Sequence, residues 1–77
     1  MADPKDTVTI EISNERLNDA IALLDRHLGN VVYPSVWRVL TAEAERRRLG
    51  GRLMPLVIRL GSLAELPVPI RAMLQPQ

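Results

Sequence analysis

The feature that most constrains this chain is a seven-residue segment near its start, Thr7–Ser13 (TVTIEIS), in which polar and apolar residues alternate without a break. Its apolar members fall on one face and are β-branched, a pattern that predicts a β-strand with one buried side. A lone strand leaves its backbone N–H and C=O groups unpaired, so it needs a neighbour. No second alternating run of matching quality follows in the sequence. We therefore expect the same strand of a second copy to be the partner.

Two helices are predicted after this strand. Ser13 or Asn14 can cap the first helix, which covers about residues 14–28, and Gly29-Asn30 ends it as a C-terminal glycine commonly does. The inward stripe of this helix recurs at helical spacing. It consists of Leu17, Ala20, Ile21, Leu24 and Leu28.

The second helix is expected to begin at Pro34, which suits a first helical turn, and to end at Gly50-Gly51. In its last turns Glu43 can pair with Arg46 or Arg47, and Glu45 with Arg48, because residues three and four apart are neighbours on a helix. We interpret the basic run 46–48 as a solvated helix end favoured by the helix dipole, with a phosphate contact as the alternative. The inward residues of this helix are Val36, Val39, Leu40 and Ala44, flanked by Trp37.

The rest of the chain is apolar but less regular. Residues 53–60 fit either a strand or a buried turn of helix, and Pro55 argues against a central strand. Residues 62–65 (SLAE) fit a capping box that opens one or two helical turns, and residues 70–74 can add a last turn. The segment is too apolar for a mere tail. It should pack on the first half of the chain, on a second copy or on a partner.

Size points to oligomerisation. A domain of 77 residues buries only about 60% of its unfolded surface, so an isolated copy would be marginally stable. The chain has no cysteine and therefore no disulfide to add stability. It also has no apolar run of about 18 residues that could span a membrane. The start Met1–Asp6 lacks the apolar region of a signal peptide, so we expect a cytoplasmic location and no entry into a membrane. Because the isolated chain would be marginally stable, we expect it to form a homodimer.

No group of residues has the arrangement of an enzyme site. His27 is the only histidine, so neither a metal site nor a proton relay is indicated. Asp19 and Asp25 do not share a helix face closely, and the serines lack the context of a nucleophile elbow. The chain is therefore expected not to be an enzyme, with no catalytic residue, no cofactor and no metal.

Charge is unevenly distributed along the chain, although the net charge is only +1. Residues 1–45 hold four basic and eight acidic residues, a net charge of −4, whereas residues 46–77 hold six basic and one acidic residue, a net charge of +5. Such a split indicates either a half that binds a polyanion or two halves that attract each other within a dimer.

The order strand, helix, glycine turn, helix over residues 6–49 resembles the ribbon–helix–helix family of dimeric repressors, of the Arc and MetJ kind. The resemblance rests on the strand TVTIEIS of residues 7–13, the helix NERLNDAIALLDRHLG of residues 14–29 and the helix that follows Pro34. In that family two chains intertwine, and their N-terminal strands form an antiparallel ribbon that enters the DNA major groove. Family ribbons usually carry Arg, Lys, Asn or Gln among the reading residues, where this chain has Glu11.

Carried over by position, the resemblance implies three groups of residues. Those that face the bases are Thr7, Thr9 and Glu11. A phosphate contact is implied for Ser35, near the start of the second helix. Apart from the resemblance, the basic residues Arg46, Arg47, Arg48 and Arg52 are expected to add contacts with phosphates that do not depend on the DNA sequence. Those that seal the dimer core are Val8, Ile10, Ile12, Leu17, Ile21, Leu24, Val36, Trp37 and Leu40.

The expected fold class is thus mainly α with one N-terminal strand, in an intertwined homodimer. Its parts are a flexible arm (1–5), a strand–helix–helix unit for dimerisation and DNA binding (6–50) and an apolar, proline-containing extension (51–77). The expected function is a transcriptional regulator of a bacterium or mobile element, a repressor or an antitoxin that binds double-stranded DNA. The alternative is a protein–protein module, such as an inhibitor of a host protein encoded by a phage or mobile element. It would dock through the acidic ribbon face or through residues 53–74 and would bind no DNA.

Overall fold

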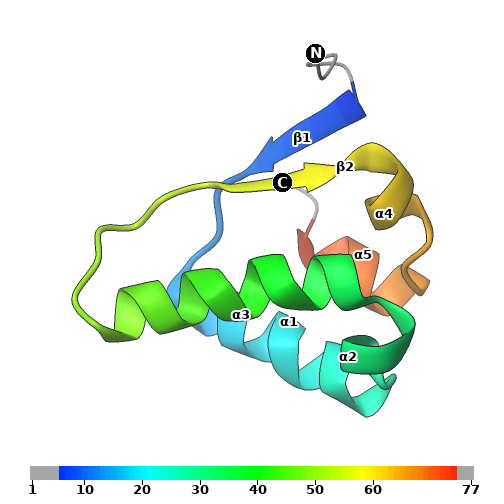
Figure 1. Ribbon diagram of the computed structural model, residues 1–77, viewed down its shortest axis with the longest axis horizontal. Coiled ribbons are helices and arrows are strands. Elements are labelled where there is room, and N and C mark those ends of the chain that lie inside the picture. Colours follow the sequence, from blue (N-terminus) through cyan, green and yellow to red (C-terminus); the bar gives the residue numbers. More distant parts are fainter. Residues whose placement is uncertain (1–5, 75–77) are drawn as a thin grey trace.

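The computed structural model describes residues 6–74, along which two strands and five helices follow one another (Figure 1). The mainly helical class predicted from the sequence is confirmed, and the expected arm 1–5 lies outside the described residues. In chain order the elements are β1 (Thr7–Ile10), α1 (Asn14–Arg26), α2 (Gly29–Val32), α3 (Pro34–Arg48), β2 (Leu56–Arg59), α4 (Leu60–Ala64) and α5 (Val68–Leu74).

The first strand finds its neighbour within its own chain. β1 pairs antiparallel with β2, with Thr7 opposite Arg59 and Ile10 opposite Leu56, which corrects the prediction of a single strand. β2 is short but alternates in burial, since Leu56 and Ile58 point inward while Val57 and Arg59 are exposed. The backbone groups that β1 must satisfy along one side are thus paired without a second copy.

Pairing also explains where β1 ends. The alternating pattern runs on to Ser13, but the strand stops at Ile10 because Ile10 pairs with the first residue of β2. Pro55 precedes that residue, and its missing N–H would remove a hydrogen bond from any longer ladder. Ile12 is still buried, so the alternation correctly predicts its inward direction although no strand pairs with it.

The turn after α1 differs from the expected glycine stop. Ser13 caps α1, and its Oγ accepts a hydrogen bond from the backbone N–H of Arg16 at 3.2 Å. The helix already ends at Arg26, before the predicted stop at Gly29-Asn30, and Leu28, with a φ of 55°, takes the left-handed conformation that a glycine commonly supplies after a helix. Gly29 is needed for another reason, since a Cβ there would lie 2.2 Å from Cγ of Leu24. The short helix α2 can therefore approach α1 closely only with glycine at this position.

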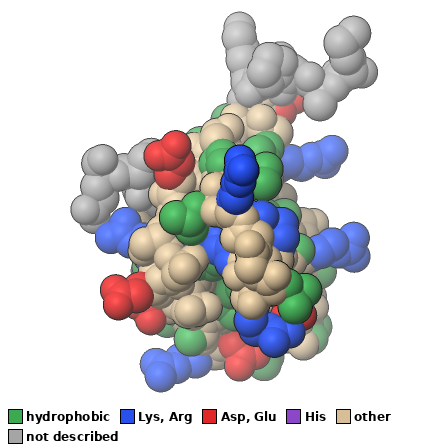
Figure 2. Space-filling view, turned by 90° about the vertical axis from the view of Figure 1, so that its left-hand side faces the viewer, with side chains coloured by type: hydrophobic (Ala, Val, Ile, Leu, Met, Phe, Trp, Pro, Cys, Tyr) green, Lys and Arg blue, Asp and Glu red, His purple; other side chains and the backbone are tan. Residues whose placement is uncertain are grey.

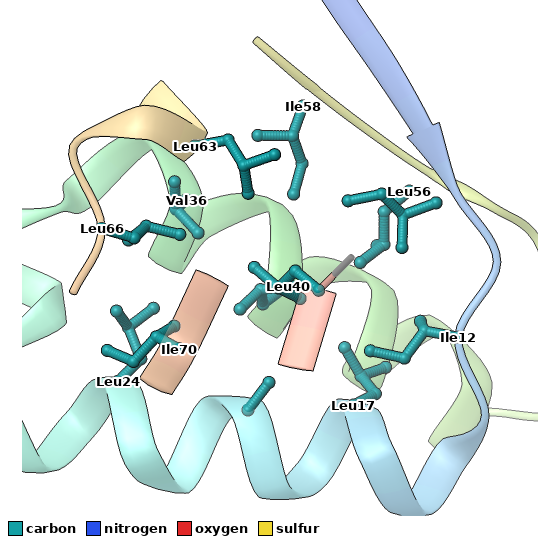
Figure 3. Packing of buried hydrophobic residues seen from close by; sticks show 13 residues of the cluster. Ile12, Leu17, Leu24, Val36, Leu40, Leu56, Ile58, Leu63, Leu66 and Ile70 are labelled. Carbon is teal, nitrogen blue, oxygen red and sulfur yellow. The ribbon is translucent and has the colours of Figure 1, made fainter. Parts of the chain in front are cut away.

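One core unites both halves of the chain (Figure 3). Of the three expectations for the last third of the chain, the structure shows the first: α5 packs on α1, and β2 on α3. Ser62 lies inside α4 rather than capping it, because that helix already begins at Leu60, so the predicted capping box is wrong. The buried apolar residues are Ile10, Ile12, Leu17, Ala20, Leu24, Val36, Leu40, Leu56, Ile58, Leu63, Leu66, Ile70 and Leu74.

The residues predicted to seal a dimer core all belong to this core of a single copy. Six of them are buried, namely Ile10, Ile12, Leu17, Leu24, Val36 and Leu40. The other three, Val8, Ile21 and Trp37, are partly buried and pack against the cluster. Their burial needs no second chain, and a role in a dimer stays a prediction.

Candidate functional site

The two paired strands form a ribbon with one buried and one exposed face. Val8, Ile10, Leu56 and Ile58 turn toward the core, as the alternation of side chains along a strand requires. The opposite face carries Thr7, Thr9, Val57 and Arg59, of which all but the half-buried Thr7 are exposed. Two of the three residues predicted to face DNA bases thus lie together on this face.

Glu11, the third predicted base-reading residue, lies elsewhere. It follows the last paired residue of β1 and is exposed beside a pocket that Leu53 and Met54 also line. The exposed ribbon face therefore lacks the carboxylate that the sequence placed on it. In its stead β2 contributes Arg59, opposite Thr7.

Sequence reasoning did not single out Arg59. The signal for it was the short apolar run Leu56-Val57-Ile58 that follows a proline and ends at Arg59. A four-residue run is too short to separate a strand from a helical turn by periodicity. The pairing with β1 settles the matter, since it places residues more than forty positions apart side by side.

Beside the ribbon lies a small pocket of about 250 Å³ between β2 and the first turns of α3. Its polar lining residues are Ser35, Arg59 and Ser62, and Val36 and Val39 line it from α3. Arg59 makes no ion pair within residues 6–74. Arginine and serine side chains both donate hydrogen bonds to anionic oxygens. Of the predicted phosphate contacts, Ser35 is thus brought next to the ribbon.

The arginine run at the end of α3 is divided by burial. The side chain of Arg47 is only 6% exposed, and its Nε donates to Oε2 of Glu43 at 2.6 Å. Its terminal nitrogens donate to the carbonyls of Ile12 at 2.9 Å and Met54 at 3.0 Å and to Oδ1 of Asn14 at 3.0 Å. Arg47 therefore ties α3 to the β1–α1 connection and to the loop before β2, and it is not the solvated residue that the sequence suggested.

Arg46 completes this arrangement from the other side. Its guanidinium forms a bidentate pair with Glu43, at 2.9 Å and 2.8 Å, and also donates to the carbonyl of Arg52. The hydrogen bonds from Arg46, and after them those from Arg47, outweigh burial and lower the pKa of Glu43 to about 2. The pairing of Glu43 predicted from helical spacing is confirmed with both arginines. We call Glu43, Arg46 and Arg47 the arginine clamp.

The remaining predicted phosphate contacts are on the surface. Arg48 pairs with Glu45 at 2.6 Å, as the spacing predicted, and both side chains are more than half exposed. Arg52 lies in the exposed loop between α3 and β2. The structure thus leaves Ser35, Arg48 and Arg52 accessible and holds Arg46 and Arg47 in the clamp.

Within residues 6–74 no three metal-ligating side chains come together, and no helix is long and apolar enough to cross a membrane. His27 is exposed, with its Nδ1 2.9 Å from the carbonyl of Leu23.

Comparison with known proteins identifies no relative. No protein-family model, no curated protein and no solved structure matches this chain. The function must therefore be argued from the site itself.

Proposed function

We propose that this protein is a small DNA-binding regulator whose β1–β2 ribbon enters the major groove of double-stranded DNA. The observation that carries the proposal is the exposed ribbon face, on which Arg59 lies opposite Thr7 and shares the face with Thr9. The major groove is wide enough for a two-stranded ribbon, and arginine to guanine is the commonest specific contact there. Threonine contacts any base edge, and Val57 can contact a thymine methyl group.

This ribbon differs from that of the ribbon–helix–helix family in the origin of its two strands. There two chains each give one strand, whereas here β2 fills the place of the second copy's strand. The proposal therefore keeps Thr7 and Thr9 as base-reading residues, replaces Glu11 by Arg59 and does not require intertwined chains. Removing a carboxylate from the reading face also removes its repulsion of the phosphates.

Phosphate contacts position a ribbon without reading sequence. In the proposal they come from Ser35 in the pocket next to Arg59 and from Arg48 and Arg52, while the clamp arginines serve the fold. A homodimer is part of the same proposal, because dimeric regulators read two half-sites with two equivalent elements. A repressor or an antitoxin is the kind of regulator expected.

The test is the affinity for duplex DNA of mixed sequence, measured by fluorescence anisotropy at about 50 mM salt, where phosphate contacts are strong. Arg59→Ala should weaken binding by about 1–3 kcal/mol, the range for a base-contacting arginine. The matched control is Arg26→Ala, which removes the same charge from the far end of α1. Equal affinity of Arg59→Ala and the wild type, or no rise in anisotropy when the wild type is added to the DNA, would overturn the proposal.

A second function, a protein–protein module, is favoured by the apolar side chains of the α3–β2 loop. The structure narrows the surface expected at residues 53–74, because six of its large apolar residues are in the core. Leu53, Met54, Val57, Leu60 and Val68 remain exposed. Capture of one partner protein in the presence of nuclease, by a chain that does not bind DNA, would support this function instead.

A further inference from the structure

Val57 is the one apolar side chain among residues 7–10 and 56–59 that lies on the exposed face of the ribbon. It is 56% exposed, whereas its neighbours Leu56 and Ile58 are each 3% exposed and belong to the core. Arg59 follows two positions later on the same strand and the same face. The exposed face of β2 thus presents a hydrocarbon side chain next to a guanidinium.

The register with β1 places a threonine beside each of these two residues. Thr9 lies opposite Val57, and Thr7 lies opposite Arg59. Side chains directly opposite each other on two strands are about 5 Å apart, and side chains two positions apart on one strand are about 7 Å apart. The face therefore consists of two neighbouring pairs, Arg59 with Thr7 and Val57 with Thr9, which are about 7 Å from each other.

The dimensions of this ribbon match those of the major groove. The groove is about 12 Å wide, whereas two paired strands are about 5 Å apart, so the ribbon fits with its strands running along the groove. Successive base pairs are about 3.4 Å apart along the DNA axis. The two pairs of side chains then face base pairs that are about one or two positions apart.

Arg59 and Val57 favour different bases. Guanine offers two acceptors, N7 and O6, to a guanidinium in the major groove, and thymine is the only base that offers a methyl group there. Valine has no hydrogen-bonding group, so it would leave the amino group of adenine or cytosine, or the oxygen of guanine, without a partner. Contact with the thymine methyl group instead removes apolar surface of both partners from water. Val57 therefore favours thymine at its position.

The surroundings of β2 provide contacts with phosphates at both of its ends. Ser35 lines the pocket beside Arg59, and Arg52 lies in the exposed loop that leads into Leu56. In Figure 1 that loop projects from one end of the molecule, and Figure 2 faces this end, over which arginine side chains are exposed. Such contacts fix the position of a protein on the duplex without reading its sequence. They would hold Val57 and Arg59 over the base edges between them.

We propose that Val57 and Arg59 determine which DNA sequence this protein binds: Arg59 contacts a guanine, and Val57 contacts the methyl group of a thymine about one or two base pairs away. The inference rests on the proposed function and names the bases that the ribbon selects. Thr7 and Thr9 accompany the two contacts, since a threonine hydroxyl can both donate and accept a hydrogen bond.

The test begins with a selection of bound duplexes from a library in which the central base pairs are randomised. The selected sequences should share a guanine and a thymine that lie within about two base pairs of each other. Replacing that thymine by uracil removes only its methyl group, and the wild type should bind the uracil duplex about fourfold more weakly, the effect of burying one such group. Fluorescence anisotropy at about 50 mM salt measures both affinities.

Variants at position 57 identify the side chain that makes the contact. Val57→Ser removes both methyl groups and should bind the thymine and uracil duplexes with equal affinity, whereas Val57→Ile keeps a β-branched apolar side chain and should retain the preference for thymine. The matched control is Val68→Ser, because Val68 is 65% exposed but lies in α5, and it should discriminate as the wild type does. A merely structural role of Val57 in the strand would weaken binding to both duplexes equally. Circular dichroism checks that each variant is folded.

Arg59→Ala separates this inference from the proposed function. It should bind more weakly and lose the preference for guanine, yet still distinguish thymine from uracil. A wild type that binds DNA and is weakened by Arg59→Ala, but binds the thymine and uracil duplexes equally, would overturn the inference alone. A Val57→Ser variant that still prefers thymine would do the same. A wild type with no affinity for duplex DNA would overturn the proposed function and the inference together.

Discussion

The last turns of α3 carry two carboxylate–arginine groups made of the same residue types. Glu43 pairs with Arg46 and Arg47, and Glu45 pairs with Arg48, all at spacings of three or four residues. In the first group the side chains of Glu43 and Arg47 are 10% and 6% exposed and that of Arg46 is 36% exposed, whereas Glu45 and Arg48 are 56% and 68% exposed. Helical spacing brings both groups together, but only the first also holds distant parts of the chain.

The difference shows under which conditions an ion pair on a helix contributes to the free energy of unfolding. An exposed pair gains little because water and salt screen it and long side chains lose entropy. A buried pair is costly to break, because the remaining partner stays as an uncompensated charge. Arg47 adds contacts with Ile12, Asn14 and Met54, so its loss would leave carbonyl groups of two further segments without a donor.

The largest expected effect is that of Arg47→Met, which keeps the apolar stem and removes the guanidinium. It leaves the Glu43 carboxylate buried with one partner fewer, so we expect the free energy of unfolding to fall by about 3 kcal/mol. Urea denaturation at pH 7 measures the loss, with Arg48→Met as the matched control, for which we expect a loss of less than about 1 kcal/mol. Equal losses in the two variants would show that burial does not distinguish the two groups.

If Arg47→Met does not fold, Arg47→Lys tests the same contacts with a smaller expected loss of stability. Lysine retains the charge but lacks the planar fork that reaches several acceptors at once. We expect a stability between those of the wild type and Arg47→Met.

The second expected effect is a pH dependence confined to the buried group. The pKa of Glu43 is lowered from its ordinary value of 4.5 to about 2, so the folded chain binds this proton less readily than the unfolded chain does. The stabilisation is therefore fully present above pH 4.5 and is lost as the pH falls toward 2. Comparing unfolding of the wild type and Glu43→Gln should give a difference that shrinks across this range.

Glu45→Gln serves as the control for this titration. Its hydrogen bond with Arg48 also lowers the pKa of Glu45, but the pair is exposed and screened. We expect its difference from the wild type to depend on pH much less. A larger dependence for Glu45→Gln than for Glu43→Gln would contradict the comparison.

The smallest expected effect concerns salt. At an ionic strength of about 1 M the Debye length falls to about 3 Å, so the Glu45–Arg48 pair is screened and the mostly buried Glu43–Arg47 pair much less. Arg48→Met should lower the melting temperature slightly at low salt and not at all at high salt. The loss caused by Arg47→Met should persist at both. Thermal melts at the two salt concentrations measure these differences in melting temperature. If the loss caused by Arg47→Met disappeared at high salt, the Glu43–Arg47 pair would be screened like the exposed Glu45–Arg48 pair, and the comparison would fail.

Much of the fold follows from local patterns. Alternation places Ile10 and Ile12 inward and Pro34 begins α3, as predicted, and Ser13, one of the two predicted caps, caps α1. The local patterns failed at two places. Leu28 rather than the glycine takes the left-handed conformation after α1, and four residues of β2 become a strand because β1, more than forty residues away in sequence, lies beside them.

The residues of the candidate site were likewise predictable from the sequence only in part. Thr7 and Thr9 were predictable, since strand periodicity assigns them to the polar face. Arg59 was not, because its position on that face depends on the register with β1. The burial and the hydrogen bonds of Arg47 could not be predicted either, because its acceptors at Ile12 and Met54 belong to other segments of the chain.

The sequence by itself therefore determined the helices α1 and α3, the inward face of the first strand and the pairing of charges along α3. These depend on residues within about one or two turns of each other, whose geometry is set by helical and strand periodicity. Only the tertiary structure decided which strand completes the ribbon and which arginine is buried. Both depend on which distant segments reach each other, and that is settled by the packing of a shared core rather than by any local preference.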